Sequence, residues 1–239
     1  MIRIVDKKMK YTNETMELMQ PLHTSTIGHF TDFGFVNDLK TTHPGNKISG
    51  TVVTVKLSNG DGKPITEALN ETEAGDILII DTSGNKTHAC WGEFRSLQAL
   101  ATKVSGVIIN GAITDLDTLW QVNLPVYYET VSAKTTKPLN LEAEIHGLVS
   151  VGGVVFESGD YVIATRMGFI NLTHWITRKL SKKHGEKKSE KKFEGARFKR
   201  KLQIIEVRGT MSSCSSGGGV DLIIVSSNSR HNPFIQTFM

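Results

Sequence analysis

The sequence predicts an α/β domain, because short apolar runs alternate with polar and amphipathic stretches from residue 50 onward. Residues 76–81 (DILIID) and 107–110 (VIIN) are continuous apolar runs, which is typical of strands buried on both faces. Between them, residues 92–105 repeat apolar side chains at spacings of three and four, the period of an amphipathic helix. We therefore expect a layered mixed sheet with flanking helices.

The other elements follow from the same patterns in chain order. Strands are predicted at residues 50–57, 125–129 and 161–165, and a short helix at 65–75. Residues 149–156 (VSVGGVVF) alternate around Gly152 and Gly153, which predicts a β-hairpin. In the helix over 92–105, the stripe consists of Phe94, Leu97, Ala101 and Val104, and Gly106 stands where a C-cap is expected.

Charge divides the chain into two parts. Residues 178–201 hold twelve Lys or Arg and three Glu, a local charge of +9, so the net charge of +4 leaves −5 for the remainder. We expect one domain over residues 1–168 and a Lys-rich C-terminal extension over 169–239. The basic segment could bind RNA or an acidic partner, but it offers only Phe193 and Phe198 for stacking. A solvated helix is therefore favoured, and nucleic acid is not expected as a partner.

Several classes of protein are excluded by composition. No apolar run approaches the roughly 20 residues of a membrane helix, and the first residues lack the apolar core of a signal peptide. Two cysteines, Cys90 and Cys214, form no disulfide framework, so a cytoplasmic protein is expected. His23, His88 and His146 share no metal-ligand spacing.

The first candidate site stretch is TSGNKTHACWGEFR, residues 82–95, between a buried strand and the amphipathic helix. Gly92 and Glu93 fall at the predicted helix start, where unpaired N–H groups and the helix dipole can bind an anion. The alternative is a helix cap that binds no ligand.

The second candidate stretch is NGAITDLD, residues 110–117, directly after the next buried strand. Ligand sites in open α/β sheets gather at the carboxyl ends of strands, and both stretches lie there. Asp115 and Asp117 could supply oxygen ligands to a hard cation. The alternative is a helix start that favours carboxylates.

Taken in order, the motifs resemble those of one protein family. They are TSTIGHFTDFG, GTVVTVKL, EAGDILIID, G-x-x-x-x-A-x-WGE, VIINGAITDLD, PVYYE and VGGVVFESGDYVIAT. This order over about residues 16–168 is similar to the RraA-like family, which includes ribonuclease E activity regulators and 4-hydroxy-4-methyl-2-oxoglutarate aldolases. The resemblance implies a homotrimer or hexamer with sites between subunits.

The resemblance also implies a mechanism for catalytic members. Asp115 would hold Mg²⁺ or Mn²⁺, largely through water, and the helix start over Gly92, Glu93, Phe94 and Arg95 would bind the pyruvoyl end of a small 2-oxo acid. The cation would polarise the 2-oxo group and stabilise the enolate left by C–C cleavage.

One departure concerns the residue before Asp115. The resemblance implies an arginine that grips the substrate carboxylate, and this chain has Thr114, which cannot make a bidentate pair. Arg95 could reach the anion site instead, because long helical side chains lean toward their own N-terminus; otherwise it is a surface residue.

Two functions of different classes follow. The leading one is a divalent-metal-dependent aldolase or oxaloacetate decarboxylase, with activity weakened or lost because of Thr114. The alternative is a non-catalytic relative that binds and regulates a protein partner such as an RNA-processing enzyme. A third possibility is a degenerate relative with neither activity.

Overall fold

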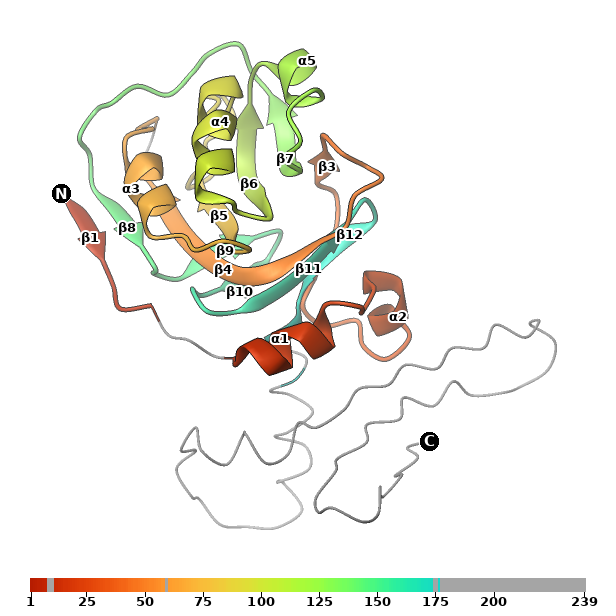
Figure 1. The fold of residues 1–239 in the computed structure, drawn as a ribbon. Coiled ribbons are helices and arrows are strands. Elements are labelled where there is room, and N and C mark those ends of the chain that lie inside the picture. The colour runs from red at the N-terminus through yellow and green to blue at the C-terminus, as the bar shows by residue number, and fades with distance from the viewer. Residues whose placement is uncertain (8–10, 59, 174–175, 177–239) are drawn as a thin grey trace, which may run out of the picture.

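The computed structural model describes residues 1–7, 11–58, 60–173 and 176 (Figure 1). The described chain forms one mixed sheet in the order β2-β12-β11-β4-β5-β6-β7-β3, with β8 and then β1 branching from β4, and a separate β9–β10 hairpin. The strands are β1 (Ile2–Ile4), β2 (Phe35–Val36), β3 (Lys40–Thr41), β4 (Ile48–Leu57), β5 (Ile77–Asp81), β6 (Gly106–Ile113), β7 (Val126–Val131), β8 (Ala143–Ile145), β9 (Val149–Val151), β10 (Val154–Phe156), β11 (Tyr161–Thr165) and β12 (Gly168–Asn171). The helices are α1 (Asn13–Met19), α2 (Thr24–Gly28), α3 (Pro64–Asn70), α4 (Glu93–Thr102) and α5 (Leu116–Leu119). The predicted α/β class is confirmed.

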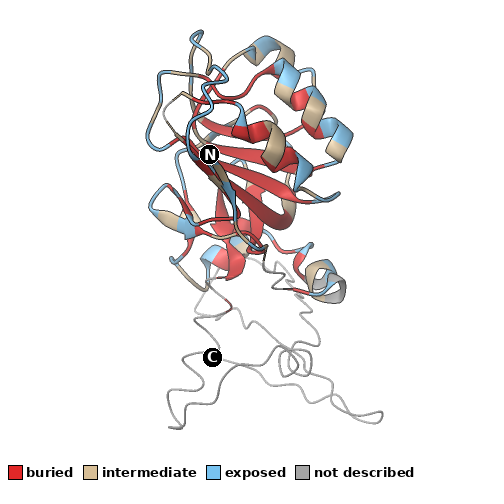
Figure 2. Cartoon of the chain, turned by 90° about the vertical axis from the view of Figure 1, so that its left-hand side faces the viewer, coloured by how far each residue is buried: buried red, intermediate tan, exposed pale blue. Residues whose placement is uncertain are grey.

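The parallel strands β4 to β7 form the buried centre of the sheet (Figure 2). Alternate residues of β5 face opposite sides: Leu78 and Ile80 pack in a core with α3 and α4, while Ile77 and Ile79 pack in a second core with the β9–β10 hairpin. Apolar material on both faces explains why these strands are apolar throughout.

Strand β4 changes partners along one edge. Its first paired residues lie antiparallel to β11 and its last residues lie antiparallel to β8. Between these two ladders, the Thr54 amide donates to Ser158 Oγ at 2.9 Å, and the His146 amide donates to the Thr54 carbonyl at 2.9 Å. The buried His146 ring lies 2.9 Å from Ser158 Oγ. His146 therefore helps to satisfy the backbone where the ladder is interrupted.

Helix α4 differs from its prediction in two respects. It ends at Thr102 and is followed by Lys103 in the left-handed conformation, so the prediction of Gly106 as C-cap is wrong. Gly106 begins β6, where a Cβ would lie 2.5 Å from Ile48 Cδ1 and 3.0 Å from the Pro125 carbonyl oxygen. A side chain at residue 106 would therefore require the end of the Ile48 side chain, and to a smaller extent the Pro125 carbonyl, to move.

The part of the predicted stripe that lies on α4 faces outward: Phe94 is 69% exposed, Leu97 is 53% exposed, and Ala101 is exposed too. Val104 follows the helix and is buried in the core. The small residues Ser96 and Ala99 are buried against the sheet. The helical period was predicted correctly, but the buried face is the one with short side chains.

Strand β12 begins at Gly168, the last residue of the predicted domain, and continues to Asn171 between β11 and β2. The buried Asn171 side chain donates to Asp160 Oδ2 at 2.8 Å. Helices α1 and α2 pack against this part of the sheet in a third core. The Lys-rich segment over 178–201, like the rest of the extension from residue 177 on, lies outside the described residues.

Residues before the first helix also join the sheet. Strand β1 pairs in parallel with β8, with Ile2 opposite Ala143, and Lys7 Nζ lies 2.9 Å from Asp76 Oδ2 in a largely shielded ion pair. Within the described ranges, no helix has the length and apolar character needed to cross a bilayer.

A long connection joins β7 to β8 (Figure 1). The buried carboxylate of Asp61 holds this connection in place. Asp61 accepts hydrogen bonds from the amides of Lys63 at 2.9 Å, Leu139 at 3.2 Å and Leu141 at 2.7 Å. Burial alone would raise the pKa of Asp61, but these three N–H donors and the charge of Lys63 together lower it below the usual value. The ionised carboxylate thus ties the connection to the β4–α3 turn.

We predict that Asp61→Asn lowers the free energy of unfolding by about 1–3 kcal/mol at neutral pH, because an amide NH₂ would replace an acceptor facing backbone donors. The folded-state pKa of Asp61 lies below its unfolded value of about 4. The stabilisation that the ionised Asp61 carboxylate provides is therefore complete above about pH 4, and it is lost as the pH falls through the folded-state pKa. Urea unfolding of both proteins from pH 7 to pH 3 checks this. If the free energies of unfolding of wild type and Asp61→Asn differed by the same amount from pH 7 down to pH 3, the prediction would be contradicted.

Candidate functional site

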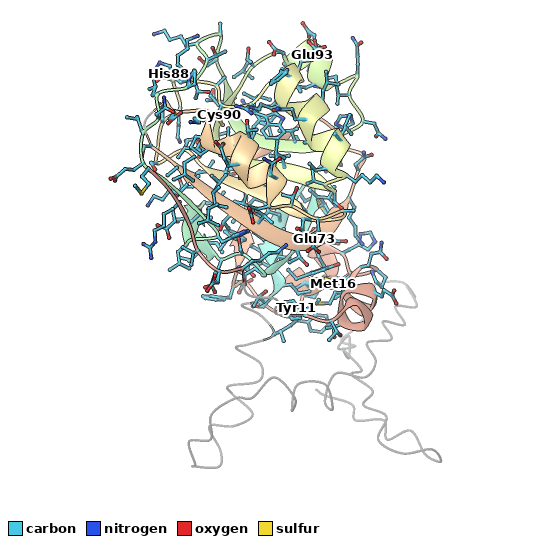
Figure 3. The ribbon with its side chains drawn as sticks, turned by 60° about the vertical axis from the view of Figure 1, so that its left-hand side comes forward. Tyr11, Met16, Glu73, His88, Cys90 and Glu93 are labelled. Atoms are coloured by element: carbon cyan, nitrogen blue, oxygen red, sulfur yellow. The ribbon has the colours of Figure 1, made fainter. Side chains whose placement is uncertain are left out.

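The two stretches singled out by sequence lie side by side at the carboxyl ends of parallel strands. Strands β5 and β6 place Asp81 opposite Asn110, and β6 then continues to Ile113. After β5 the chain loops back so that Trp91 forms a parallel bridge with Ile113. Figure 3 shows Glu93 at the upper end of α4, with His88 in the loop that precedes the helix.

Backbone hydrogen bonds join the start of α4 to the end of β6. The Cys90 amide donates to the Ala112 carbonyl at 3.1 Å, and the Thr114 amide donates to the Trp91 carbonyl at 2.8 Å. These bonds extend the parallel sheet by a short segment. As a result, the first turn of α4 faces the residues that follow β6.

At this corner, the Asp115 carboxylate caps α4. The Glu93 amide donates to Asp115 Oδ2 at 3.1 Å, and Thr114 Oγ1 donates to Asp115 Oδ1 at 3.2 Å. Asp115 itself is exposed and adopts a left-handed backbone, with φ 53° and ψ 39°, as it starts α5. A carboxylate at a helix start is favoured by the unpaired amides and the helix dipole.

Gly92 allows this close approach. A Cβ at residue 92 would lie 2.4 Å from Asp115 Oδ2 and 2.8 Å from Thr114 Cγ2. The backbone conformation of Gly92 is extended and open to any residue, so the requirement for glycine comes from space rather than from torsion angles.

Two buried residues that sequence reasoning missed fix the helix start. Trp91 Nε1 donates to Ser96 Oγ at 2.8 Å, and Ser96 Oγ donates to the Gly92 carbonyl at 3.1 Å. Both side chains are almost fully buried. A serine on the face of a helix opposite its apolar stripe is the signal that could have indicated this network.

Arg95 points to the neighbouring helix α3. Its Nη1 donates to the Thr66 hydroxyl and, at 2.9 Å, to Gln98 Oε1, while Nη2 donates to the Gly62 carbonyl at 2.8 Å. Burial lowers the pKa of Arg95, an effect that Glu67 partly offsets. The guanidinium therefore braces α4 against α3 and the preceding turn.

The thiol of Cys90, close to this corner, is not suited to act as a nucleophile. Cys90 is buried, and burial raises its pKa to about 12, so the thiol stays protonated at neutral pH.

The other polar groups of this edge attach the hairpin. Buried Asp81 accepts from the Ser83 amide at 2.8 Å and from the Ser150 amide at 3.4 Å, and Asn110 Nδ2 donates to the Ser150 carbonyl at 3.1 Å. Asp117 is exposed in the first turn of α5. Among the described residues, no group of three His, Cys, Asp or Glu could enclose a metal ion.

Comparisons with known proteins identify the family of this chain. A model of the RraA-like family, described as Aldolase/RraA, matches residues 12–170, more than half of the chain. A protein of Alcanivorax borkumensis named "Putative 4-hydroxy-4-methyl-2-oxoglutarate aldolase" is 31% identical over 122 residues, 51% of this chain and 74% of that protein. A protein of the same name from Halalkalibacterium halodurans is 26% identical over 130 residues, 54% of this chain and 61% of that protein. The chain thus spans about three fifths of the length of this second relative.

Solved structures share the fold. The RNA-processing inhibitor RraA from Thermus thermophilis has a TM-score of 0.57 and 21% identity, covering 62% of this chain and 91% of that one. A Streptomyces coelicolor protein, described as an unusual member of the RNase ES inhibitor RraA family, has a TM-score of 0.59 and 16% identity, covering 74% and 98%. At these identities the likeness concerns the fold alone.

We predict that Gly92→Ala lowers the free energy of unfolding by about 1–3 kcal/mol, because the added methyl group displaces Asp115 or Thr114 from a packed position. The Glu93 amide should also exchange faster with solvent, since its acceptor moves. Urea unfolding and amide hydrogen exchange measure the two effects. A variant with wild-type stability and wild-type protection at Glu93 would show that the corner tolerates a side chain.

Proposed function

The chain belongs to the RraA-like family, and on this premise we propose that it is a lyase that cleaves or decarboxylates a small 2-oxo acid with the help of a divalent cation. The observation that carries the proposal is the contact between the Glu93 amide and the Asp115 carboxylate. It brings a helix start, which attracts anions, next to an exposed carboxylate, which attracts cations. A 2-oxo acid needs both kinds of group.

Asp115 is the residue that would hold the cation. Each of its carboxylate oxygens accepts one hydrogen bond, from Glu93 or from Thr114, and so keeps a lone pair for a metal. A single carboxylate completed by water suits Mg²⁺ or Mn²⁺, which retain much of their hydration. When bound, the cation would polarise the 2-oxo carbonyl and stabilise the developing enolate.

The first turn of α4 would bind the substrate carboxylate. The amides of Phe94 and Arg95 have no acceptor among the described residues, and they follow Glu93 directly. Two neighbouring N–H groups at a helix start can bind the oxygens of one carboxylate. Gly92 keeps this turn open to Asp115, so the cation and the substrate would meet at one corner.

Thr114 and Arg95 determine how strong the activity would be. Thr114 offers a hydroxyl group where the family resemblance implies an arginine. Arg95 could contact a substrate only by leaving Thr66, Gln98 and Gly62. We therefore expect slow turnover, with substrate held by backbone amides rather than by a guanidinium.

The outward apolar stripe supports a proposal about assembly. Phe94, Leu97 and Leu100 are exposed on α4, and Trp120 is exposed directly after α5. A patch of this kind marks an interaction surface. We propose that a second copy covers it in a homotrimer or hexamer.

The alternative function uses the same patch. In a non-catalytic relative, the stripe would bind another protein, such as an RNA-processing enzyme, and Asp115 would serve only as the cap of α4. The two functions differ in whether the protein turns over a 2-oxo acid.

We predict that the protein releases pyruvate from oxaloacetate with Mg²⁺ or Mn²⁺ and that chelator stops the release. Asp115→Asn should lower the metal-dependent rate by at least about tenfold, because a neutral amide binds the cation more weakly. A coupled lactate dehydrogenase assay measures the rate. Asp6→Asn, an exposed carboxylate before α1, serves as the matched control. Equal chelator-sensitive rates in wild type and Asp115→Asn would assign the cation elsewhere, and absence of turnover in every condition would favour the non-catalytic alternative.

We predict that the purified protein sediments as a trimer or hexamer at micromolar concentration, and that Leu97→Glu shifts it toward monomer. A carboxylate in the middle of the apolar stripe would have to be desolvated on assembly. Analytical ultracentrifugation distinguishes the species. A wild-type monomer would remove the proposed assembly, and an oligomer unaffected by Leu97→Glu would place its interface elsewhere.

A further inference from the structure

A buried hydroxyl group lies behind the first turn of α4. The side chain of Ser96 is directed from the helix toward the sheet and is fully buried, and the indole ring of Trp91 is almost fully buried beside it. Buried polar groups cost free energy unless each finds a hydrogen-bond partner. Ala99 fills the next buried position of the same helix without any polar group. Packing against the sheet therefore does not by itself account for a hydroxyl group at residue 96.

The hydrogen bonds of Ser96 lead to a single peptide group. Trp91 Nε1 donates to Ser96 Oγ at 2.8 Å, and Ser96 Oγ donates to the Gly92 carbonyl at 3.1 Å. The Ser96 amide donates to the same carbonyl at 3.1 Å, which is the ordinary bond of an α-helix. The Gly92 carbonyl thus accepts two hydrogen bonds, as many as its lone pairs allow.

The same peptide group contacts Asp115 through its N–H. Its nitrogen is that of Glu93, and this amide donates to Asp115 Oδ2 at 3.1 Å. Because the C=O and N–H of a peptide are conjugated, hydrogen bonds that the oxygen accepts make the N–H a better donor. The indole of Trp91, the hydroxyl of Ser96 and the amide of Glu93 therefore form one chain of hydrogen bonds that ends on the Asp115 carboxylate.

This chain of hydrogen bonds lies within one protomer and on the inner side of α4. The indole N–H can only donate, so the Ser96 hydroxyl must use its own proton toward Gly92. Phe94 and Leu97 face outward from the same helix, whereas Ser96 faces the sheet. A second subunit that covers the outer face of α4 therefore leaves these hydrogen bonds in place.

We infer that Ser96 is a positioning residue for the divalent cation, because its hydroxyl group acts through the Gly92–Glu93 peptide to hold the Asp115 carboxylate in its metal-binding orientation. This inference rests on the proposed lyase function and adds to it a residue that contacts neither substrate nor cation. Loss of a group that orients a metal ligand commonly weakens metal binding by about tenfold or more. Removal of the Ser96 hydroxyl should therefore be measurable at Asp115.

The first test is spectroscopic and needs no metal. In Ser96→Ala the amide proton of Glu93 should resonate upfield of its wild-type position and exchange faster with solvent, because it becomes a weaker donor to Asp115. Two-dimensional NMR measures both effects. Thr102→Ala is the matched control, since it removes a hydroxyl that donates to the Ala99 carbonyl at 3.0 Å in the last turn of the same helix. An unchanged Glu93 signal in Ser96→Ala, or the same change in both variants, would overturn the inference.

A second measurement follows the cation itself. Titration of the full chain with Mn²⁺, with the free ion detected by electron paramagnetic resonance, should give a Kd about tenfold higher in Ser96→Ala than in wild type. Thr102→Ala should keep the wild-type Kd, and Asp115→Asn shows the effect of losing the metal ligand. Equal Mn²⁺ affinity in wild type and Ser96→Ala would overturn the inference, and so would a wild-type affinity that Asp115→Asn leaves unchanged.

Variants of Trp91 separate positioning from a merely structural role. Ser96→Ala leaves the buried indole N–H without an acceptor and so also destabilises the fold, whereas Trp91→Phe with Ser96→Ala removes both partners. Trp91→Phe alone keeps the bond from Ser96 to Gly92. The Kd for Mn²⁺ should rise about equally in the two proteins that lack the hydroxyl, and less in Trp91→Phe. A Kd that instead follows the urea stability of the variants would show a structural role only and refute the inference.

Pyruvate release from oxaloacetate is measured on the same proteins, which distinguishes this inference from the lyase function. Weaker Mn²⁺ binding in Ser96→Ala with no turnover in any protein would refute the lyase function and support the positioning role. Turnover with the same Mn²⁺ requirement in wild type and Ser96→Ala would refute the positioning role and leave the lyase function intact.

Discussion

The hydrogen bond from the Thr114 amide to the Trp91 carbonyl is the contact on which the site depends. Together with the bond from the Cys90 amide to the Ala112 carbonyl, it joins the segment before α4 to the end of β6. As a result, the residues just before α4 lie beside the end of β6 in the register of a short parallel strand. Trp91 serves both halves, because its carbonyl accepts from Thr114 while its indole binds Ser96 inside α4. Functional groups held in this way, on regular backbone and by buried side chains, keep their positions more closely than groups on free loops.

Much of the fold could be predicted because its strands are buried on both faces. The runs at 76–81 and 107–110 are almost entirely apolar, so their composition alone indicated strands buried on both faces. The direction of α4 could not be predicted in the same way. A helical period identifies an apolar stripe, but it does not say whether the sheet or another molecule covers that stripe. Here Ser96 and Ala99 face the sheet because α4 lies close to it, and the larger side chains are left outside.

The proximity of the two candidate stretches was predictable from sequence, but their contacts were not. Parallel topology brings the residues after β5 and β6 to one edge, which is why Glu93 and Asp115 could be placed together from sequence. Their supporting partners come from elsewhere in the chain: Arg95 reaches Gly62 and Thr66, and Asp81 reaches Ser150. Such contacts depend on how separate elements pack, so a local sequence pattern does not predict them. The same holds for His146, whose role appears only when β4 is seen to exchange partners.

The pairing of β1 with β8 has a consequence for the order of assembly during synthesis. Residues 2–4 leave the ribosome long before residues 143–145 exist, yet these segments are hydrogen-bonded neighbours in the finished sheet. Contacts so far apart in sequence are slow to form, because a long loop must close before they contribute. Strand β1 therefore stays unpaired until residues 143–145 have been translated.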